Sequence, residues 1–363
     1  MNRYFYRKRQ HKLPSLAVSA VPALHHTRRV LLSLFGRFGA ICQALSVARE
    51  ASIQHPDIEW LLICSPQLHP YCQALLPKAK AIISIGRNDL VGLYRACREI
   101  KQFRPELGLN PWGHGIDSEY FASQAVAYRP FNSFWHEYHS TPVNSGDAIS
   151  HGNFFNMLRN YFGLATVAKS NSRPYSFCPI RRIMVSPESS EAKRTLSPAM
   201  TQILLQRVRT QFGKTCDIWL AASDHRYRAL EGLTRLITLE KSQHSSASFI
   251  KAITHSELML AVDSGPMNIA TALNIPTIAI FSSEAPERVV DFAQPPLVLR
   301  DPLIAGQSCQ NRQCQEPLCM NRMIEQSMLF EPENIWQCAK SVTTSEGDCI
   351  WQIAETKIDA ATQ

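Results

Sequence analysis

The sequence predicts an α/β protein of two domains, each built on a mainly parallel sheet with helices on both faces. Short apolar runs, suited to buried strands, alternate with longer stretches that have apolar residues at helical spacing, and this alternation occurs twice. Between the two series, residues 129–179 lose the alternation and are rich in aromatic, Asn, Ser and His residues. A chain of 363 residues, 45% of them apolar, is long enough to fill two cores.

The same changes of pattern set the domain boundaries that we expect. They are a basic tail over residues 1–27, an N-terminal α/β domain over 28–175, a C-terminal α/β domain over 176–345, and a tail over 346–363. The first tail is either a solvated segment or a contact for an anionic membrane surface, because five cations gather in it. These are Arg3, Arg7, Lys8, Arg9 and Lys12.

Strands and helices of the first domain follow one another in order. We expect strands over residues 29–35, 60–64, 81–85 and 107–110, and helices over 40–50, 67–76 and 90–103. Gly36 and Gly39 follow the first strand, where glycine allows close backbone approach. There is no full dinucleotide fingerprint, which argues against an epimerase or oxidoreductase that uses a dinucleotide.

The second domain repeats this order. We expect strands over residues 183–185, 217–221, 236–239, 258–262 and 277–281, and helices over 198–212, 224–233 and 248–254. Ser197 is placed to cap the first of these helices.

The stretch 258–283 is the unit around which the chain is organised. A buried strand turns sharply into a helix, with Pro266 in the first helical turn and Asp263 or Ser264 supplying the N-cap oxygen. In open α/β sheets, ligands bind beyond the carboxyl ends of the strands, and free N–H groups at a helix start favour an anion such as phosphate. The alternative is an ordinary strand–helix–strand unit.

Composition limits the classes of partner. The formal net charge of +8 favours acidic partners, but no basic helix or aromatic–basic motif indicates a nucleic-acid binder. No apolar run is long enough for a membrane span, and the basic start lacks the apolar core of a secretory signal. Eleven scattered cysteines fit reduced thiols in a cytoplasm.

Two further stretches carry polar or thiol groups. Residues 108–120 place His114 and Asp117 between glycines directly after a strand, and we expect a loop that is either a plain surface loop or part of a site. Near the end, Cys309, Cys314 and Cys319 recur at five-residue steps, wider than the usual ligand spacing of a structural zinc site. We therefore expect no metal there.

The stretch 258–283 resembles the donor-site signature of glycosyltransferase family 9, the bacterial heptosyltransferases. An Asp-Ser/Thr-Gly-x-x-His-x-Ala-x-Ala-Leu pattern followed by a proline-led strand is typical of that family. Asn268 stands where histidine is usual, and the polar loop 186–198 resembles the family's phosphate-binding loop, with Lys193 at the lysine position and Arg194 next to it. The matching residues are Asp263, Ser264, Gly265, Ala270, Ala272, Leu273 and Pro276.

The resemblance implies the GT-B fold, two doubly wound Rossmann-like domains facing across a cleft. It implies that the N-terminal domain is the acceptor side and that the C-terminal domain binds the nucleotide sugar. It implies an inverting glycosyltransferase of lipopolysaccharide biosynthesis that moves heptose from ADP-heptose to an inner-core or other surface-glycan acceptor, without a metal or other cofactor. The protein is then cytoplasmic, at the inner face of the inner membrane. The implied donor-binding residues are Lys193, Arg194, Asp263, Ser264, Gly265, Pro266, Met267 and Asn268.

Ala40 is the main departure from the family pattern. The family's opening Gly-x-x-Gly-Asp places its proposed catalytic base where this chain has Ala40 after Gly36 and Gly39. Alanine cannot accept a proton, so Asp117, or His114, is the candidate base. The alternatives are a catalytically degenerate nucleotide-sugar-binding protein, or a transferase with a different sugar or a protein acceptor.

Overall fold

The computed structural model describes most of both α/β regions. The described residues are 27–35, 38–86, 88–111, 116–130, 155, 158–164, 174–176, 180–222, 225–230, 232, 234–238, 243–284, 286, 290, 292, 296–301, 320, 324, 342–343 and 349–352. The chain divides into two compact units, the first mostly within Met1–Thr166 and the second mostly within Val167–Gln363. Lys241–Ile250 and Glu287–Ala293 belong to the first unit.

A five-stranded parallel sheet forms the centre of the first unit. Its order is β3-β2-β1-β4-β5, so the chain starts in the middle and crosses over once. The strands are β1 (Arg29–Leu34), β2 (Glu59–Cys64), β3 (Ala81–Ser84), β4 (Leu107–Asn110) and β5 (Ala127–Pro130). Nearly every residue of β1 and β2 is buried, as expected for strands covered on both faces.

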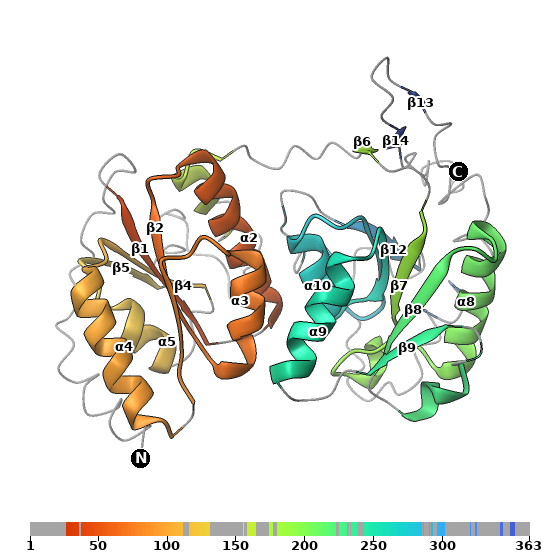
Figure 1. Cartoon of the computed structure of the whole chain (residues 1–363), viewed down its shortest axis with the longest axis horizontal. Coiled ribbons are helices and arrows are strands. Elements are labelled where there is room, and N and C mark those ends of the chain that lie inside the picture. The colour runs from red at the N-terminus through yellow and green to blue at the C-terminus, as the bar shows by residue number, and fades with distance from the viewer. Residues whose placement is uncertain are drawn as a thin grey trace, which may run out of the picture. The chain divides into compact units, whose positions relative to one another are not determined.

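Helices cover both faces of this sheet (Figure 1). On one face lie α2 (Phe38–Gln54) and α3 (His69–Leu75), which follows the short 3₁₀ turn η2 (Pro66–Leu68). On the other lie α4 (Leu90–Phe103) and α5 (Ile116–Ala122). The side chains of Leu93, Ala96 and Ile100 on α4 and of Tyr120 and Phe121 on α5 share one core with β1, β2 and β3.

The second unit contains a six-stranded parallel sheet of order β12-β11-β10-β7-β8-β9. Its strands are β7 (Arg182–Ser186), β8 (Asp217–Ala222), β9 (Arg235–Thr238), β10 (Leu258–Val262), β11 (Thr277–Phe281) and β12 (Leu297–Arg300). All five residues of β10 and of β11 are buried. These central strands fix the positions of the loops that follow them.

In the second unit, α8 (Pro198–Phe212) covers one face of the sheet and α10 (Gly265–Ala272) covers the other (Figure 1). Helix α9 (Gln243–Thr254) is divided between the units, because its residues up to Ile250 belong to the first. Ser197 caps α8, accepting a hydrogen bond from the Met200 amide at 3.2 Å, as the sequence predicts. Shorter 3₁₀ segments are η3 (Ala192–Arg194) and η4 (His225–Leu230). A small antiparallel sheet joins β6 (Pro174–Ser176), β14 (Cys349–Gln352) and β13 (Val342–Thr343).

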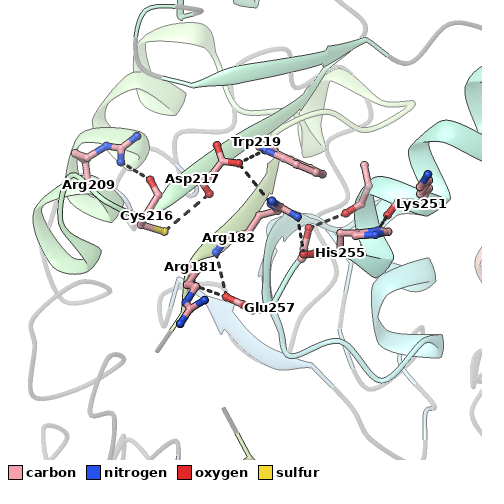
Figure 2. Close-up of polar contacts among 11 residues, drawn as sticks. Arg181, Arg182, Arg209, Cys216, Asp217, Trp219, Lys251, His255 and Glu257 are labelled. Carbon is pink, nitrogen blue, oxygen red and sulfur yellow. Dashed lines mark hydrogen bonds and ion pairs between the residues drawn. The ribbon is translucent and has the colours of Figure 1, made fainter. Parts of the chain in front are cut away.

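A glutamate carboxylate binds the backbone amides at the amino end of a central strand in each sheet, and we call each set of contacts a carboxylate clamp. In the first, Glu106 accepts hydrogen bonds from the amides of Arg28 (2.6 Å) and Arg29 (3.0 Å) and pairs with the Arg29 guanidinium at 2.8 Å. In the second, Glu257 accepts from the amides of Arg181 and Arg182 (Figure 2). These contacts satisfy amides that have no partner at the strand start.

The Arg182 side chain extends the second clamp (Figure 2). Its guanidinium lies 4.2 Å from the Trp219 ring centre and donates to Asp217 at 3.4 Å, while the Trp219 indole N–H donates to Asp217 at 2.7 Å. Each of these three side chains therefore has a polar partner within the fold, as is usual for polar groups that are partly buried.

Two parallel sheets with helices on both faces confirm the predicted α/β class with Rossmann-like domains. The helices 90–103 and 198–212 and the strands 107–110, 258–262 and 277–281 have the predicted bounds. The prediction of a loop over 108–120 is wrong in part, because residues 116–122 form α5. None of the helices in the described part of the chain has the length and apolar character needed to cross a bilayer.

Candidate functional site

The loops after three adjacent strands of the second sheet meet at its carboxyl edge. β10 lies between β7 and β11, and all three are parallel, so the residues after Ser186, Val262 and Phe281 come together. The Ser282 hydroxyl donates to the backbone carbonyl of Lys193 at 2.7 Å, which ties the loop after β11 to the loop after β7. This is the edge at which open α/β sheets bind ligands.

A buried ion pair joins the loops after β7 and β10. The Arg194 guanidinium donates to the Asp263 carboxylate at 2.8 Å, and their side chains are only 17% and 7% exposed. Two of the residues that the sequence assigns to the donor site, which are 69 positions apart, are therefore in direct contact. The structure thus brings together the two halves of the predicted site.

Glu191 holds both cations of the loop. Its carboxylate lies 3.3 Å from the Lys193 ammonium and 3.3 Å from the Arg194 guanidinium, which also donates to the Ser190 hydroxyl at 3.4 Å. Lys193 is only 13% exposed, in contrast to an ordinary solvated lysine. The 3₁₀ turn η3 thereby presents two positive charges at the strand edge, as phosphate binding requires.

Burial raises the pKa of the Asp263 carboxyl above its usual value. The Arg194 charge and hydrogen bond act in the opposite direction, while Glu284 and Glu191 raise the pKa further. The charged form of Asp263 is thus destabilised, since the carboxylate is desolvated and lies near two other acids. A ligand that donates hydrogen bonds to Asp263, such as a sugar hydroxyl, would relieve part of this cost.

The turn before α10 differs from the predicted capping. Ser264 occupies the N-cap position, but neither its side chain nor that of Asp263 caps the helix, because Asp263 binds Arg194 instead. Asn268 donates from its side-chain amide to the Ser264 carbonyl at 2.9 Å. Pro266 stands in the first turn without an N–H, so the amides of Gly265 and Met267 are the donors available to an anion at this helix start.

Several buried oxygens at the same edge find no hydrogen-bond partner among the described residues. They are Ser186 Oγ, Ser264 Oγ, Ser283 Oγ and Asn268 Oδ1, in residues that are 1–7% exposed. Buried polar atoms are almost always satisfied, and such a cluster needs explaining. Ser186 ends β7, and the other three residues follow β10 or β11, so all four lie at the sheet edge that carries Lys193 and Asp263, as expected for a polar ligand.

The first unit places Asp117 on α5, directly after β4. The next residue, Ser118, is buried, and its hydroxyl accepts from the Phe35 amide at 3.2 Å. Phe35 immediately follows β1, so the start of α5 is tied to the strand end that leads to α2. Ala40 lies buried in the first turn and a half of α2. The backbone of Asp117 therefore belongs to the same sheet edge as the family's usual base position.

Other candidates fall outside the described residues. These are His114 and the three cysteines Cys309, Cys314 and Cys319. Among the residues that are described, no group of three or more His, Cys, Asp or Glu side chains is arranged to hold a metal ion.

Sequence reasoning missed the supporting residues of the site. Ser282 and Ser283 could have been found, because two hydroxyl residues directly after a buried strand lie at a ligand-binding edge. Glu191 gives no such signal, since one acidic residue in a polar loop is usually solvated.

One stretch of the chain matches a known protein family. The model of glycosyltransferase family 9 (heptosyltransferase) matches residues 209–320, which include β10 and α10. The comparison with curated protein sequences gives no significant match.

Solved structures resemble the chain over most of its length. A family 9 glycosyl transferase from Veillonella parvula DSM 2008 is 14% identical, with a TM-score of 0.51, over 77% of this chain and 87% of that one. E. coli heptosyltransferase II is 15% identical, with a TM-score of 0.50, over 83% and 98%. E. coli heptosyltransferase WaaC with ADP-2-deoxy-2-fluoro heptose is 13% identical, with a TM-score of 0.50, over 83% and 98%. At these identities the likeness establishes the fold.

Proposed function

We propose that the chain is a heptosyltransferase of glycosyltransferase family 9, whose model matches residues 209–320, and that it transfers heptose from ADP-heptose to a lipopolysaccharide inner-core acceptor. One observation carries the proposal. The Arg194–Asp263 contact joins the two segments that resemble the family's donor site, at the carboxyl edge of a parallel sheet. Cations, a helix start and a carboxylate then surround one point, as a nucleotide-activated sugar requires.

Each group at this edge has a distinct role in the proposed reaction. Lys193 and the amides of Gly265 and Met267 bind the diphosphate, and Asp263 accepts hydrogen bonds from sugar hydroxyls and orients the ring. Arg194 holds the Asp263 carboxylate in its charged form and adds positive charge beside the diphosphate. The buried oxygens of Ser264, Ser283 and Asn268 complete the polar lining.

The proposed transfer is a direct displacement with inversion at the anomeric carbon. The acceptor oxygen forms its bond to that carbon while the bond to the phosphate oxygen breaks, and ADP leaves with the electron pair. A base removes the proton of the acceptor hydroxyl, and Asp117 takes this role in place of Ala40. Negative charge grows on the leaving diphosphate, where Lys193 and the helix-start amides stabilise it without a metal ion.

A second candidate has its own observation. Ala40, buried at the family's base position, also suits a degenerate protein that binds a nucleotide sugar without transferring it. A transferase with another sugar or a protein acceptor would use the same donor edge. In each case the proposed location is cytoplasmic, at the inner face of the inner membrane.

The experiment that tests the proposal is a calorimetric titration with ADP-heptose and a panel of nucleoside diphosphates, with release of ADP followed in parallel. We expect ADP-heptose and ADP to bind, and ADP release to accelerate when an inner-core acceptor is added. Binding without release on any acceptor would favour the degenerate protein. If neither ADP nor ADP-heptose binds, the assignment of the donor is wrong.

A further inference from the structure

Helix α4 presents large apolar side chains to solvent. Leu90, Val91 and Tyr94, in its first turn and a half, are 54%, 80% and 72% exposed. The opposite face of the helix is packed in the core through Leu93 and Ile100. The exposed apolar residues are therefore additional to those that hold α4 on the sheet, and folding of the domain does not explain them.

Cations continue the same face toward the end of the helix. At 3.6 residues per turn, Arg98 and Lys101 follow Val91 and Tyr94 along one side, and Arg95 flanks them. All three basic side chains are exposed. The face thus has an apolar first half and a basic second half, so apolar and cationic groups lie next to each other on one exposed surface, and buried apolar area and attraction to anionic lipids are the two contributions that bind a helix to a membrane interface.

The acidic groups of α4 do not cancel this charge. Asp89 serves as the N-cap, accepting from the Gly92 amide at 2.7 Å. Glu99 lies at the border of the exposed face and contacts Arg98 at 3.4 Å, an exposed pair of little energetic weight. The face therefore keeps a net positive charge, and a negatively charged partner would complement it.

The position of α4 in the fold supports the same partner. The helix follows β3, so its apolar first turn lies at the carboxyl edge of the first sheet. The start of α5, which contains Asp117, lies at that same edge, because α5 follows β4 of the same parallel sheet. When the first turn of α4 touches a bilayer, an acceptor embedded in that bilayer would lie near this edge of the sheet.

We propose that the exposed face of α4 binds the surface of a bilayer that contains anionic lipids. Leu90, Val91 and Tyr94 enter the headgroup region, and Arg95, Arg98 and Lys101 contact the lipid phosphates. The inference rests on the proposed function, because a glycolipid acceptor is found in such a bilayer. A single helix face of this kind is small for a stable protein–protein interface, which buries about 800 Å² on each partner.

Flotation of the full chain with lipid vesicles tests the proposal. We compare vesicles of phosphatidylcholine alone with vesicles that contain 30% phosphatidylglycerol, at low and high salt. Partitioning should be strong only with the anionic vesicles at low salt, because salt screens the attraction. The variant Arg95→Gln/Arg98→Gln/Lys101→Gln should partition roughly a hundredfold more weakly, since each cation near an anionic surface contributes about a factor of five.

Matched controls separate a local contact from general charge. Lys78→Gln/Lys214→Gln/Lys251→Gln removes three exposed cations elsewhere and should lose much less partitioning. Val91→Ser/Tyr94→Ser should lose on the order of tenfold, whereas Val126→Ser, at an equally exposed valine, should lose little.

Equal losses of partitioning for the α4 variants and their controls would overturn the proposal. Partitioning of the α4 variants that equals that of the parent would also overturn it and would assign membrane binding to the basic N-terminal tail. A concentration-dependent dimer that Val91→Ser/Tyr94→Ser abolishes, without vesicle binding, would identify a second copy as the occupant instead. Titration of each variant with ADP-heptose distinguishes a failure of the membrane proposal from a failure of the proposed function, because α4 lies in the first unit and the donor residues lie in the second. Failure of donor binding in the parent would overturn the function and leave the vesicle result standing.

Discussion

Replacing Arg194 should lower the free energy of unfolding, because the buried Asp263 carboxylate loses its cation. Arg194→Leu leaves Asp263, 7% exposed, without its cation. Removing one partner of a buried pair costs about 3–5 kcal/mol, and the 17% exposure of Arg194 places the expected loss near the low end, about 3 kcal/mol at pH 8. For a domain of this size, that corresponds to a fall of about 6–12 °C in the midpoint of thermal unfolding.

The loss should depend on pH in a defined direction. The pKa of Asp263 is already raised in the folded protein, and without Arg194 it rises further. The variant therefore loses stability as pH rises through the range above the ordinary Asp pKa of about 3.9, and its difference from the parent shrinks as the pH falls from 8 to 4.5.

Scanning calorimetry of the second domain's transition at both pH values measures this dependence. Arg228→Leu, an exposed arginine of the same unit, is the control and should have little effect. Arg194→Leu/Asp263→Asn should recover most of the stability, because no buried charge is left unpaired. An equal loss at both pH values, or no recovery in the double variant, would refute the electrostatic explanation.

Three other changes test separate parts of the molecule. Lys193→Ala should weaken ADP-heptose binding by about one to two orders of magnitude in calorimetry, as loss of a charge-assisted contact implies, whereas Lys78→Ala should not. Asp117→Asn should keep donor affinity and lose turnover in an ADP-release assay, and retained turnover would exclude it as the base. Chelators should leave activity intact in the same assay, and a loss of activity would indicate a metal ion at Cys309, Cys314 and Cys319.

The first-domain clamp gives a further prediction about acid stability. Burial alone would raise the pKa of Glu106, but the amides of Arg28 and Arg29 and the Arg29 charge outweigh it and lower that pKa. Glu106 thus contributes stability above its ordinary pKa of about 4.3, and that contribution is lost as the pH falls through the lowered folded pKa. Glu106→Gln should cost about 1 kcal/mol at pH 7 and progressively less toward pH 3 in urea unfolding. A cost that stays constant over this range would contradict the assigned charge.

The fold could be read from the sequence where burial is complete. β10 is apolar at every position, β11 is apolar at every position after Thr277, and α8 begins with the Ser197-Pro198 capping pair, so their bounds were predicted correctly. α5 was missed because glycine and polar residues precede it, and its burial depends on β1 and β4, which only the tertiary structure brings together.

The candidate site could be predicted only in its parts. The residue types at Lys193 and Asp263 indicated a phosphate and a sugar contact, but contact between Arg194 and Asp263 follows from the strand order, which places β10 beside β7. The failure of Ser264 to cap α10 has the same origin. A local rule predicts that Asp263 or Ser264 caps the helix. Instead, the Asp263 carboxylate pairs with Arg194, and the Ser264 hydroxyl has no partner among the described residues.

The carboxylate clamps of the two sheets are one device built twice. In each domain a pair of arginines opens the central strand, and a glutamate just before a neighbouring strand, Glu106 or Glu257, binds their amides. Each half of the chain therefore completes its own sheet with its own residues. Halves taken from different relatives could then be joined in one chain without either sheet losing the contacts at its strand start.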